Sequence, residues 1–152
     1  MSDAPLVGII LGSKSDMEAM EPCKKTLEDF GVPYELIVAS AHRAPEKVSA
    51  WAKGAKDKGM KVIIGAAGKA AALPGVVASH TTLPVIGVPM KTSDLGGLDS
   101  LLSIVQMPKG VPVATVAING SMNAALLAIQ IIAVSDEEYA KKFAEYKESQ
   151  AQ

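Results

Sequence analysis

The chain has 152 residues, about the length of one compact domain. An apolar fraction of 49% against 20% charged residues excludes a disordered chain, because so many apolar side chains can build a core. The 15 basic and 16 acidic residues nearly balance, which excludes the broad basic surface that binds nucleic acids or anionic membranes. We therefore expect a single domain over residues 1–152, with no nucleic-acid and no membrane partner.

One cysteine, Cys23, cannot form an internal disulfide bond, and residues 1–3 lead into a short apolar run without a signal-peptide pattern. All apolar runs stay well short of the roughly 20 residues that cross a bilayer. These features predict a cytoplasmic protein. Because few charges stand beside so many apolar residues, the chain should also expose more apolar surface than one domain can hide, which predicts a homo-oligomer.

Short apolar runs and helix-like stretches alternate along the chain. In order, the predicted strands cover residues 6–11, 34–39, 61–65, 85–88 and 113–118, and the predicted helices that follow them cover residues 16–30, 45–59, 70–80, 96–106 and 121–133. The strands are continuously apolar, which is typical of strands covered by helices on both faces. The pattern predicts an α/β fold with a central parallel sheet.

Proline and glycine positions refine these helices. Gly31 is placed to end the first helix, and Pro45 is placed to open the second at its first position. Pro22 and Pro74 lie inside the first and third predicted helices, where each should kink the helix or delay its regular part.

A last helix is predicted from Ser135, whose side chain would cap the helix while Glu138 reaches back, as in a capping box. This polar helix should run to about Lys147, and residues 149–152 should fray.

Three loops after predicted strands combine small residues with polar ones: residues 12–16, 40–45 and 65–70. In an open parallel sheet the ligand lies beyond the carboxyl ends of the strands, where helix N-termini present free amides. These loops predict a site for a small anionic ligand, best a phosphorylated metabolite. The sequence has neither the Walker pattern nor a Gly-x-Gly-x-x-Gly fingerprint after the first strand, which disfavours nucleoside triphosphate chemistry and a nicotinamide cofactor.

The second loop is the most distinctive, because Arg43, the one arginine beside fourteen lysines, directly follows His42. Arginine presents a planar fork to phosphate, and histidine exchanges protons near neutral pH. The alternative is a histidine bonded within a helix-entry turn and an arginine in a surface ion pair. The position of the two residues at a strand's carboxyl end favours the functional interpretation.

The other two loops each have a functional interpretation. In the first, Ser13, Ser15 and Asp16 supply groups suited to the hydroxyls of a sugar, yet Asp16 is equally suited to cap a helix and the serines to form a turn. In the third, backbone amides around Gly68 are suited to hold a carboxylate.

Other polar residues are assigned to the scaffold. His80 should end a helix or lie at an interface, and Cys23 should be buried. Lys91, Asp94 and Asp99 should lie in surface loops, unless their loop moves over a site. The two histidines and one cysteine are too far apart in sequence to predict a metal site.

Five segments, in order along the chain, resemble those of the class I N5-carboxyaminoimidazole ribonucleotide mutases of bacterial purine biosynthesis. The segments are Gly12-Ser13-Lys14-Ser15-Asp16, Ser40-Ala41-His42-Arg43-Ala44-Pro45, Leu73-Pro74-Gly75, Pro84-Val85-Ile86-Gly87-Val88-Pro89 and the stretch from Asp99 to Pro108. The resemblance covers essentially the whole chain. It implies a flavodoxin-like three-layer sandwich assembled as an octamer, with neither metal nor organic cofactor. It also implies a reaction that moves a carboxylate from the exocyclic nitrogen of the aminoimidazole to ring carbon C4.

Position by position, the resemblance implies that Asp16 binds the ribose and Arg43 the phosphate, with Ser13 also in the substrate site. His42 would be the general acid/base, protonating the nitrogen as carbon dioxide leaves and later removing the C4 proton. Carbon dioxide must not escape in between, so a closed pocket is expected. The pocket walls would be formed by Ser40, Ala41, Gly68 and Lys69. The resemblance also implies a subunit contact at residues 106–108.

Two positions depart from the pattern that most members show. This chain has Gly65-Ala66-Ala67-Gly68 in place of Ala-Gly-Ala-Gly, and Ala72 in place of a histidine. Class II relatives, which carboxylate aminoimidazole ribonucleotide directly with carbon dioxide, typically have lysine after the catalytic histidine, so Arg43 indicates class I. Two alternatives stay open: a carboxylase that uses carbon dioxide directly, and a non-catalytic nucleotide-binding paralogue.

Overall fold

The computed structural model describes residues 3–151 and contains a five-stranded sheet. The strands are β1 (Val7–Leu11), β2 (Tyr34–Val38), β3 (Val62–Gly68), β4 (Val85–Met90) and β5 (Ala114–Thr115). All neighbouring strands are parallel, in the order β2-β1-β3-β4-β5. This is the strand order of flavodoxin-like folds, as the resemblance implied.

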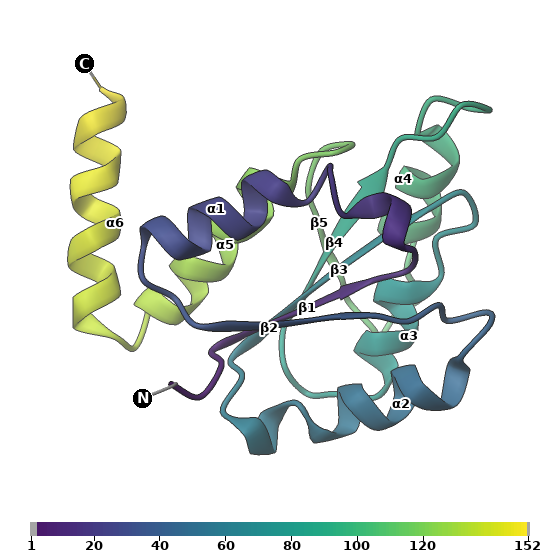
Figure 1. Cartoon of the computed structure of the whole chain (residues 1–152), viewed down its shortest axis with the longest axis horizontal. Helices are drawn as coiled ribbons and strands as arrows, with labels where there is room; N and C mark the ends of the chain where they lie inside the picture. Colours follow the sequence, from purple (N-terminus) through teal and green to yellow (C-terminus); the bar gives the residue numbers. More distant parts are fainter. Residues whose placement is uncertain (1–2, 152) are drawn as a thin grey trace.

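Helices cover both faces of the sheet (Figure 1). They are α1 (Glu21–Asp29), α2 (Pro45–Gly54), α3 (Leu73–Ser79), α4 (Leu98–Val105), α5 (Ser121–Ala133) and α6 (Glu137–Gln150), with 3-10 turns η1 (Lys14–Asp16) and η2 (Lys56–Lys58). Helices α1 and α5 pack on one face, and α2, α3 and α4 pack on the other. Between residues 3 and 151, no helix is both long and apolar enough to cross a membrane.

Each face of the sheet has its own hydrophobic core, because successive side chains of a strand point to opposite faces. Ile9 and Ile64 pack toward α1 and α5, whereas Ile10 and Ile63 pack toward α2 and α3. All four are fully buried. Two covered faces explain why the strands are continuously apolar, and the predicted α/β class is confirmed.

The prolines have the predicted effect. Pro22 and Pro74 both lie in the first turn of their helices, where a missing N–H breaks no helical bond. The regular part of α1 therefore begins at Glu21 rather than at Asp16, and α3 begins at Leu73. Residues 14–20 form the 3-10 turn η1 and further turns instead.

Strands β3 and β5 differ most from their predicted ranges, whereas β1, β2 and β4 differ by one or two residues at an end. Strand β3 continues to Gly68, which pairs with Met90 of β4, so residues 66–68 belong to the sheet and not to the predicted loop. Strand β5 is only two residues long. After β5, the backbone N–H groups of Val116 and Asn119 donate to the carbonyls of Gly87 and Pro89 in β4. Three residues after β5 therefore span the same length as two residues of β4, which forms a bulge.

The cap of the last helix was predicted wrongly. The N-cap is Asp136, whose Oδ1 accepts hydrogen bonds from the backbone of Glu138 at 3.0 Å and of Tyr139 at 3.4 Å. Helix α6 extends to Gln150, beyond the predicted end at Lys147. The predicted fraying concerns residues 149–152, of which Gln152 lies outside the described residues.

Candidate functional site

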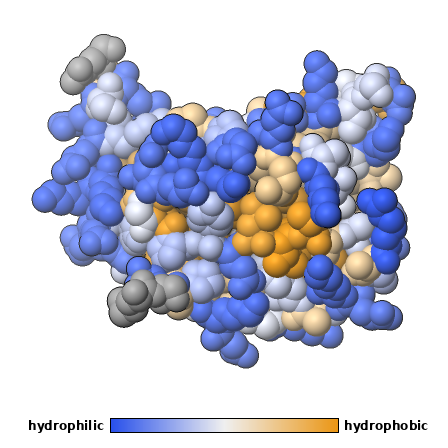
Figure 2. Space-filling model, in the orientation of Figure 1, coloured by the Kyte–Doolittle hydropathy of each residue, from blue (hydrophilic) through white to orange (hydrophobic). Residues whose placement is uncertain are grey.

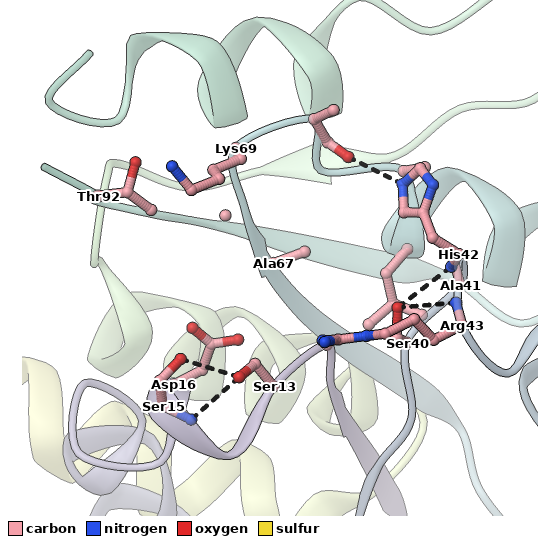
Figure 3. Close-up of a pocket in the computed structure, with 15 residues that line it drawn as sticks. Ser13, Ser15, Asp16, Ser40, Ala41, His42, Arg43, Ala67, Lys69 and Thr92 are labelled. Carbon is pink, nitrogen blue, oxygen red and sulfur yellow. Dashed lines mark hydrogen bonds between the residues drawn. The ribbon is translucent and has the colours of Figure 1, made fainter. Parts of the chain in front are cut away.

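A cavity of about 630 Å³ opens at the carboxyl ends of the central strands (Figure 3). Strand β1 lies between β2 and β3, so the chain first adds β2 on one side of β1 and then adds β3 on the other side. The direction in which strands are added therefore reverses at β1. Ligands of open α/β sheets bind at this switch point. The cavity is lined by Gly12, Ser13, Ser15, Asp16, Ser40, Ala41, His42, Arg43, Ala67, Gly68, Lys69, Ala70, Ala72, Leu73 and Thr92.

The β1–α1 loop forms one wall of the cavity. Ser13 caps the 3-10 turn: its Oγ accepts from the backbone of Ser15 at 3.2 Å and lies 2.9 Å from the Ser15 hydroxyl. Asp16 is the last residue of this turn and not its cap, so the capping interpretation of Asp16 was wrong. Its carboxylate points into the cavity (Figure 3).

Burial raises the pKa of the Asp16 carboxyl above its ordinary value, and a hydrogen bond from the Ser13 backbone offsets part of this rise. An ionised carboxylate here is an acceptor with unused capacity. Such a group is suited to accept hydrogen bonds from the hydroxyls of a ligand.

The β2–α2 loop forms the opposite wall and is organised by Ser40. The Ser40 Oγ accepts hydrogen bonds from the backbone N–H groups of His42 and Arg43, each at 3.2 Å, and its carbonyl accepts from Ala44 at 2.8 Å. These bonds turn the chain sharply before Pro45 opens α2. The side chains of His42 and Arg43 are thereby placed at the same cavity.

The His42 imidazole connects two loops that are distant in sequence. Its Nε2 lies 3.2 Å from the carbonyl oxygen of Ala70, on the loop after β3. A carbonyl oxygen only accepts, so this nitrogen carries the proton in the bond. This contact extends beyond the helix-entry turn that the alternative interpretation proposed. Arg43 takes part in none of the ion pairs among residues 3–151, so the surface-ion-pair interpretation finds no support.

The β3–α3 loop forms the third wall. Lys69 has a left-handed backbone, with φ of 54°, and its Nζ pairs with Asp94 on the loop after β4. The pairing raises the pKa of Lys69 and lowers that of Asp94, chiefly through their hydrogen bond, so both are charged at neutral pH. Of the two departures from the family pattern, Ala72 lines the cavity, whereas Ala66 is fully buried in the core beneath α1 and α5.

Thr92 is a cavity residue that the sequence analysis missed. It follows β4 and lines the cavity, and its Oγ1 is buried without a hydrogen-bond partner among the described residues. The signal was available, since a polar residue after a strand's carboxyl end had marked the other three loops. The segment around it was instead assigned to the surface.

The residues assigned to the scaffold mostly have the predicted places. His80 is the C-cap of α3. Cys23 is buried, and burial raises the pKa of its thiol to about 12. Lys91 and Asp94 are exposed loop residues, but Asp99 lies in the first turn of α4 rather than in a loop.

The expectation of a closed pocket does not hold for the single chain. Ser40, Ala41, Gly68 and Lys69 do line the cavity, but His42 and Arg43 are exposed to solvent. The loops after β1, β2 and β3, with Thr92 of the loop after β4, form the cavity walls and leave His42 and Arg43 accessible.

Comparisons with known proteins agree with this arrangement. Residues 6–152 match the family model described as AIR carboxylase. N5-carboxyaminoimidazole ribonucleotide mutases of Pyrococcus horikoshii and Thermotoga maritima are 57% and 58% identical, over 95% of this chain and 82% and 84% of theirs. Phosphoribosylaminoimidazole carboxylase of Saccharomyces cerevisiae is 57% identical over 93% of this chain and 25% of its own length. The crystal structure of Treponema denticola PurE superposes with a TM-score of 0.88 at 35% identity, covering 97% of this chain and 92% of that one.

Proposed function

The chain belongs to the AIR carboxylase family, and we propose that it is the enzyme that converts N5-carboxyaminoimidazole ribonucleotide to 4-carboxy-5-aminoimidazole ribonucleotide in purine biosynthesis. The observation that carries the proposal is the His42 imidazole, which stands at a cavity with Arg43 and Asp16 around it. Relatives at 56–58% identity that bear the mutase name support this choice of reaction.

The nucleotide would be anchored by its non-reacting parts. Arg43, free of any ion pair among the described residues, offers a guanidinium for the phosphate. Asp16 would accept hydrogen bonds from the ribose hydroxyls, with the Ser13 hydroxyl beside it. These contacts would hold the aminoimidazole ring near His42 and Ala70.

The chemistry needs one proton in each of two steps. First the bond between the exocyclic nitrogen and its carboxylate breaks, carbon dioxide forms, and the nitrogen keeps the electron pair and takes a proton from the His42 imidazolium. The ring carbon C4 then attacks carbon dioxide, and the neutral imidazole removes the C4 proton. His42 returns to its starting state, as an isomerisation without a cofactor requires.

We also propose that the protein works as a homo-oligomer in the cytoplasm, an octamer as in the enzymes it resembles. Exposed apolar side chains on and just before α4 support an oligomer: Leu98, Leu102 and Val105 of the helix are 53%, 48% and 46% exposed, and Leu95 in the preceding loop is 62% exposed. Residues 106–108, the proposed subunit contact, directly follow this helix. Figure 2 shows an apolar patch near the centre of another face, where the half-exposed edge strand β2 lies in front.

The choice of substrate tests the proposal. The purified protein is given N5-carboxyaminoimidazole ribonucleotide without bicarbonate, or aminoimidazole ribonucleotide with bicarbonate. A mutase forms the C4-carboxylated nucleotide from the first mixture. Product from the second mixture alone would make the protein a carboxylase, and product from neither would leave a nucleotide-binding role.

A further inference from the structure

Lys69 adopts a backbone conformation that favours glycine. Its φ of 54° lies in the left-handed region, where a side chain is strained against its own backbone. Such strain persists where contacts with the surrounding structure fix the residue's conformation, and strained residues are enriched at functional sites. Lys69 lies at the cavity, so the structure keeps a lysine side chain at a position that a glycine would occupy more easily.

The Lys69 side chain spans two loops. Its Nζ pairs with Asp94, which lies on the loop between β4 and α4. The two side chains are 62% and 69% exposed, and ion pairs at such exposure contribute little to folding stability. Folding stability therefore does not explain this ion pair.

The pair crosses the part of the cavity wall that β3 and β4 share. Gly68 pairs with Met90 in the sheet, and a Cβ on Gly68 would lie 2.9 Å from the Thr92 methyl group, so the two strand ends are packed tightly. In Figure 3 the Lys69 amine extends toward the Thr92 side of the cavity and away from His42.

Neighbouring residues of one loop thus make two cross-loop contacts. Ala70 accepts from His42 on the β2 side, and Lys69 pairs with Asp94 on the β4 side. Beyond Asp94 the loop continues through Gly96 and Gly97, both at positive φ, so a conformationally permissive stretch follows the contact.

We propose that Lys69 and Asp94 form a positioning clasp that holds the β4–α4 loop against the end of β3 and closes the Thr92 side of the cavity around carbon dioxide. The inference rests on the proposed function. Carbon dioxide has no charge for a cation or anion to hold, so walls that exclude water and block escape must retain it between the two steps. Asp94 also neutralises Lys69 and keeps it from stabilising the carboxylate that has to leave.

The test removes and then exchanges the two charges. Lys69→Gly removes the side chain and leaves a residue that adopts a positive φ without strain. Asp94→Asn removes the charge with little change of shape. The double variant K69D/D94K restores the pair with its charges exchanged, and aspartate tolerates the left-handed region better than most residues. Asp29→Asn is the matched control, since Lys25 and Asp29 form an exposed pair at 2.9 Å on α1, outside the cavity.

The measurement is the fate of N5-carboxyaminoimidazole ribonucleotide. After subtraction of a blank without enzyme, the amount of free aminoimidazole ribonucleotide is divided by the amount of C4-carboxylated product. We expect this ratio to rise at least about threefold in Lys69→Gly and Asp94→Asn, because carbon dioxide escapes before C4 captures it. It should return to near the unmodified value in K69D/D94K and stay unchanged in Asp29→Asn.

Three results would overturn the clasp. The ratio could stay the same in both single variants, or stay raised in the charge-exchanged variant. It could also rise only in Lys69→Gly, which would mean that the lysine contacts the carboxylate directly. Failure of the proposed function is separate from these results, because the unmodified protein would then form no C4-carboxylated product.

Discussion

Ser40 shows how one hydroxyl can organise a site. Its Oγ accepts hydrogen bonds from the backbone N–H groups of His42 and Arg43 and so fixes the direction in which these two side chains leave the chain. The imidazole of His42 then reaches Ala70 on another loop, and Arg43 remains available for a ligand. The reactive and the anchoring group are therefore oriented by a residue that need not touch the substrate's reacting atoms.

Asp16 should make nucleotide binding depend on pH. Burial raises the pKa of its carboxyl, so it takes up a proton at a higher pH than a free aspartate, and the protonated form is the weaker acceptor for the ribose hydroxyls. Binding should be strongest above this pKa and weaken as the pH falls through it. Asp16→Asn should weaken binding by about 1.5–3 kcal/mol, roughly tenfold to a hundredfold in Kd.

Calorimetric titration with aminoimidazole ribonucleotide between pH 4 and pH 7 checks this prediction. The phosphate of the ligand also titrates, so the informative quantity is the difference between the unmodified protein and Asp16→Asn. If both lose affinity in parallel as the pH falls, Asp16 does not bind the ribose.

At the scale of elements, most of the scaffold could be predicted from the sequence. Continuous apolar runs such as that of β1 arise because helices cover both faces. Proline is tolerated in the first turn of a helix and kinks its interior, so Pro22 and Pro74 predicted either a kink or a late start, and the structure shows the late start. Such rules act between residues that are close in the sequence. They also predicted the cavity, because the loops after β1, β2 and β3 all lie at one edge of a parallel sheet.

The features that the sequence could not predict depend on tertiary packing. Ser135 and Asp136 are both good capping residues, and the choice follows from Tyr139, which is buried and donates its hydroxyl to Gly31 at 3.1 Å. Likewise, the contact between Lys69 and Asp94 depends on the register of β3 against β4, which no local pattern reveals.

The cap of α6 gives a matched pair of variants. Asp136→Ala removes the carboxylate that accepts two N–H groups and should lower the free energy of unfolding by about 1 kcal/mol. Ser135→Ala should change it by only a few tenths of a kcal/mol, since surface changes away from such features have small effects. Urea denaturation followed by circular dichroism measures both. A larger loss in Ser135→Ala would restore the capping box predicted from the sequence.

At the scale of the whole molecule, an open cavity and an apolar helix face belong together. The loops that line the cavity leave His42 and Arg43 exposed, and α4 with the loop before it presents four apolar side chains to solvent. A subunit packed on α4 would cover this surface. This exposed apolar surface supports the proposal that the protein is a homo-oligomer.

Charge on the α4 face should break the assembly. A Leu98→Asp variant would place a carboxylate in the proposed interface and should weaken association at least about tenfold, because a buried unpaired charge is costly. Val134→Asp is the control, since Val134 is apolar and 89% exposed but lies outside α4. Light scattering coupled to gel filtration reports the mass of each. If Val134→Asp dissociates and Leu98→Asp stays assembled, the interface does not lie on α4.

The role of His42 as general acid/base is tested most directly by the His42→Asn variant, assayed with N5-carboxyaminoimidazole ribonucleotide. Asparagine keeps a polar group near the position of the histidine Nδ1 but cannot exchange protons at neutral pH. We predict that kcat falls at least about a hundredfold, because the variant lacks the general acid/base, while the Kd for aminoimidazole ribonucleotide changes little. A variant that binds the nucleotide normally and still turns over at a near-normal rate would contradict this role of His42.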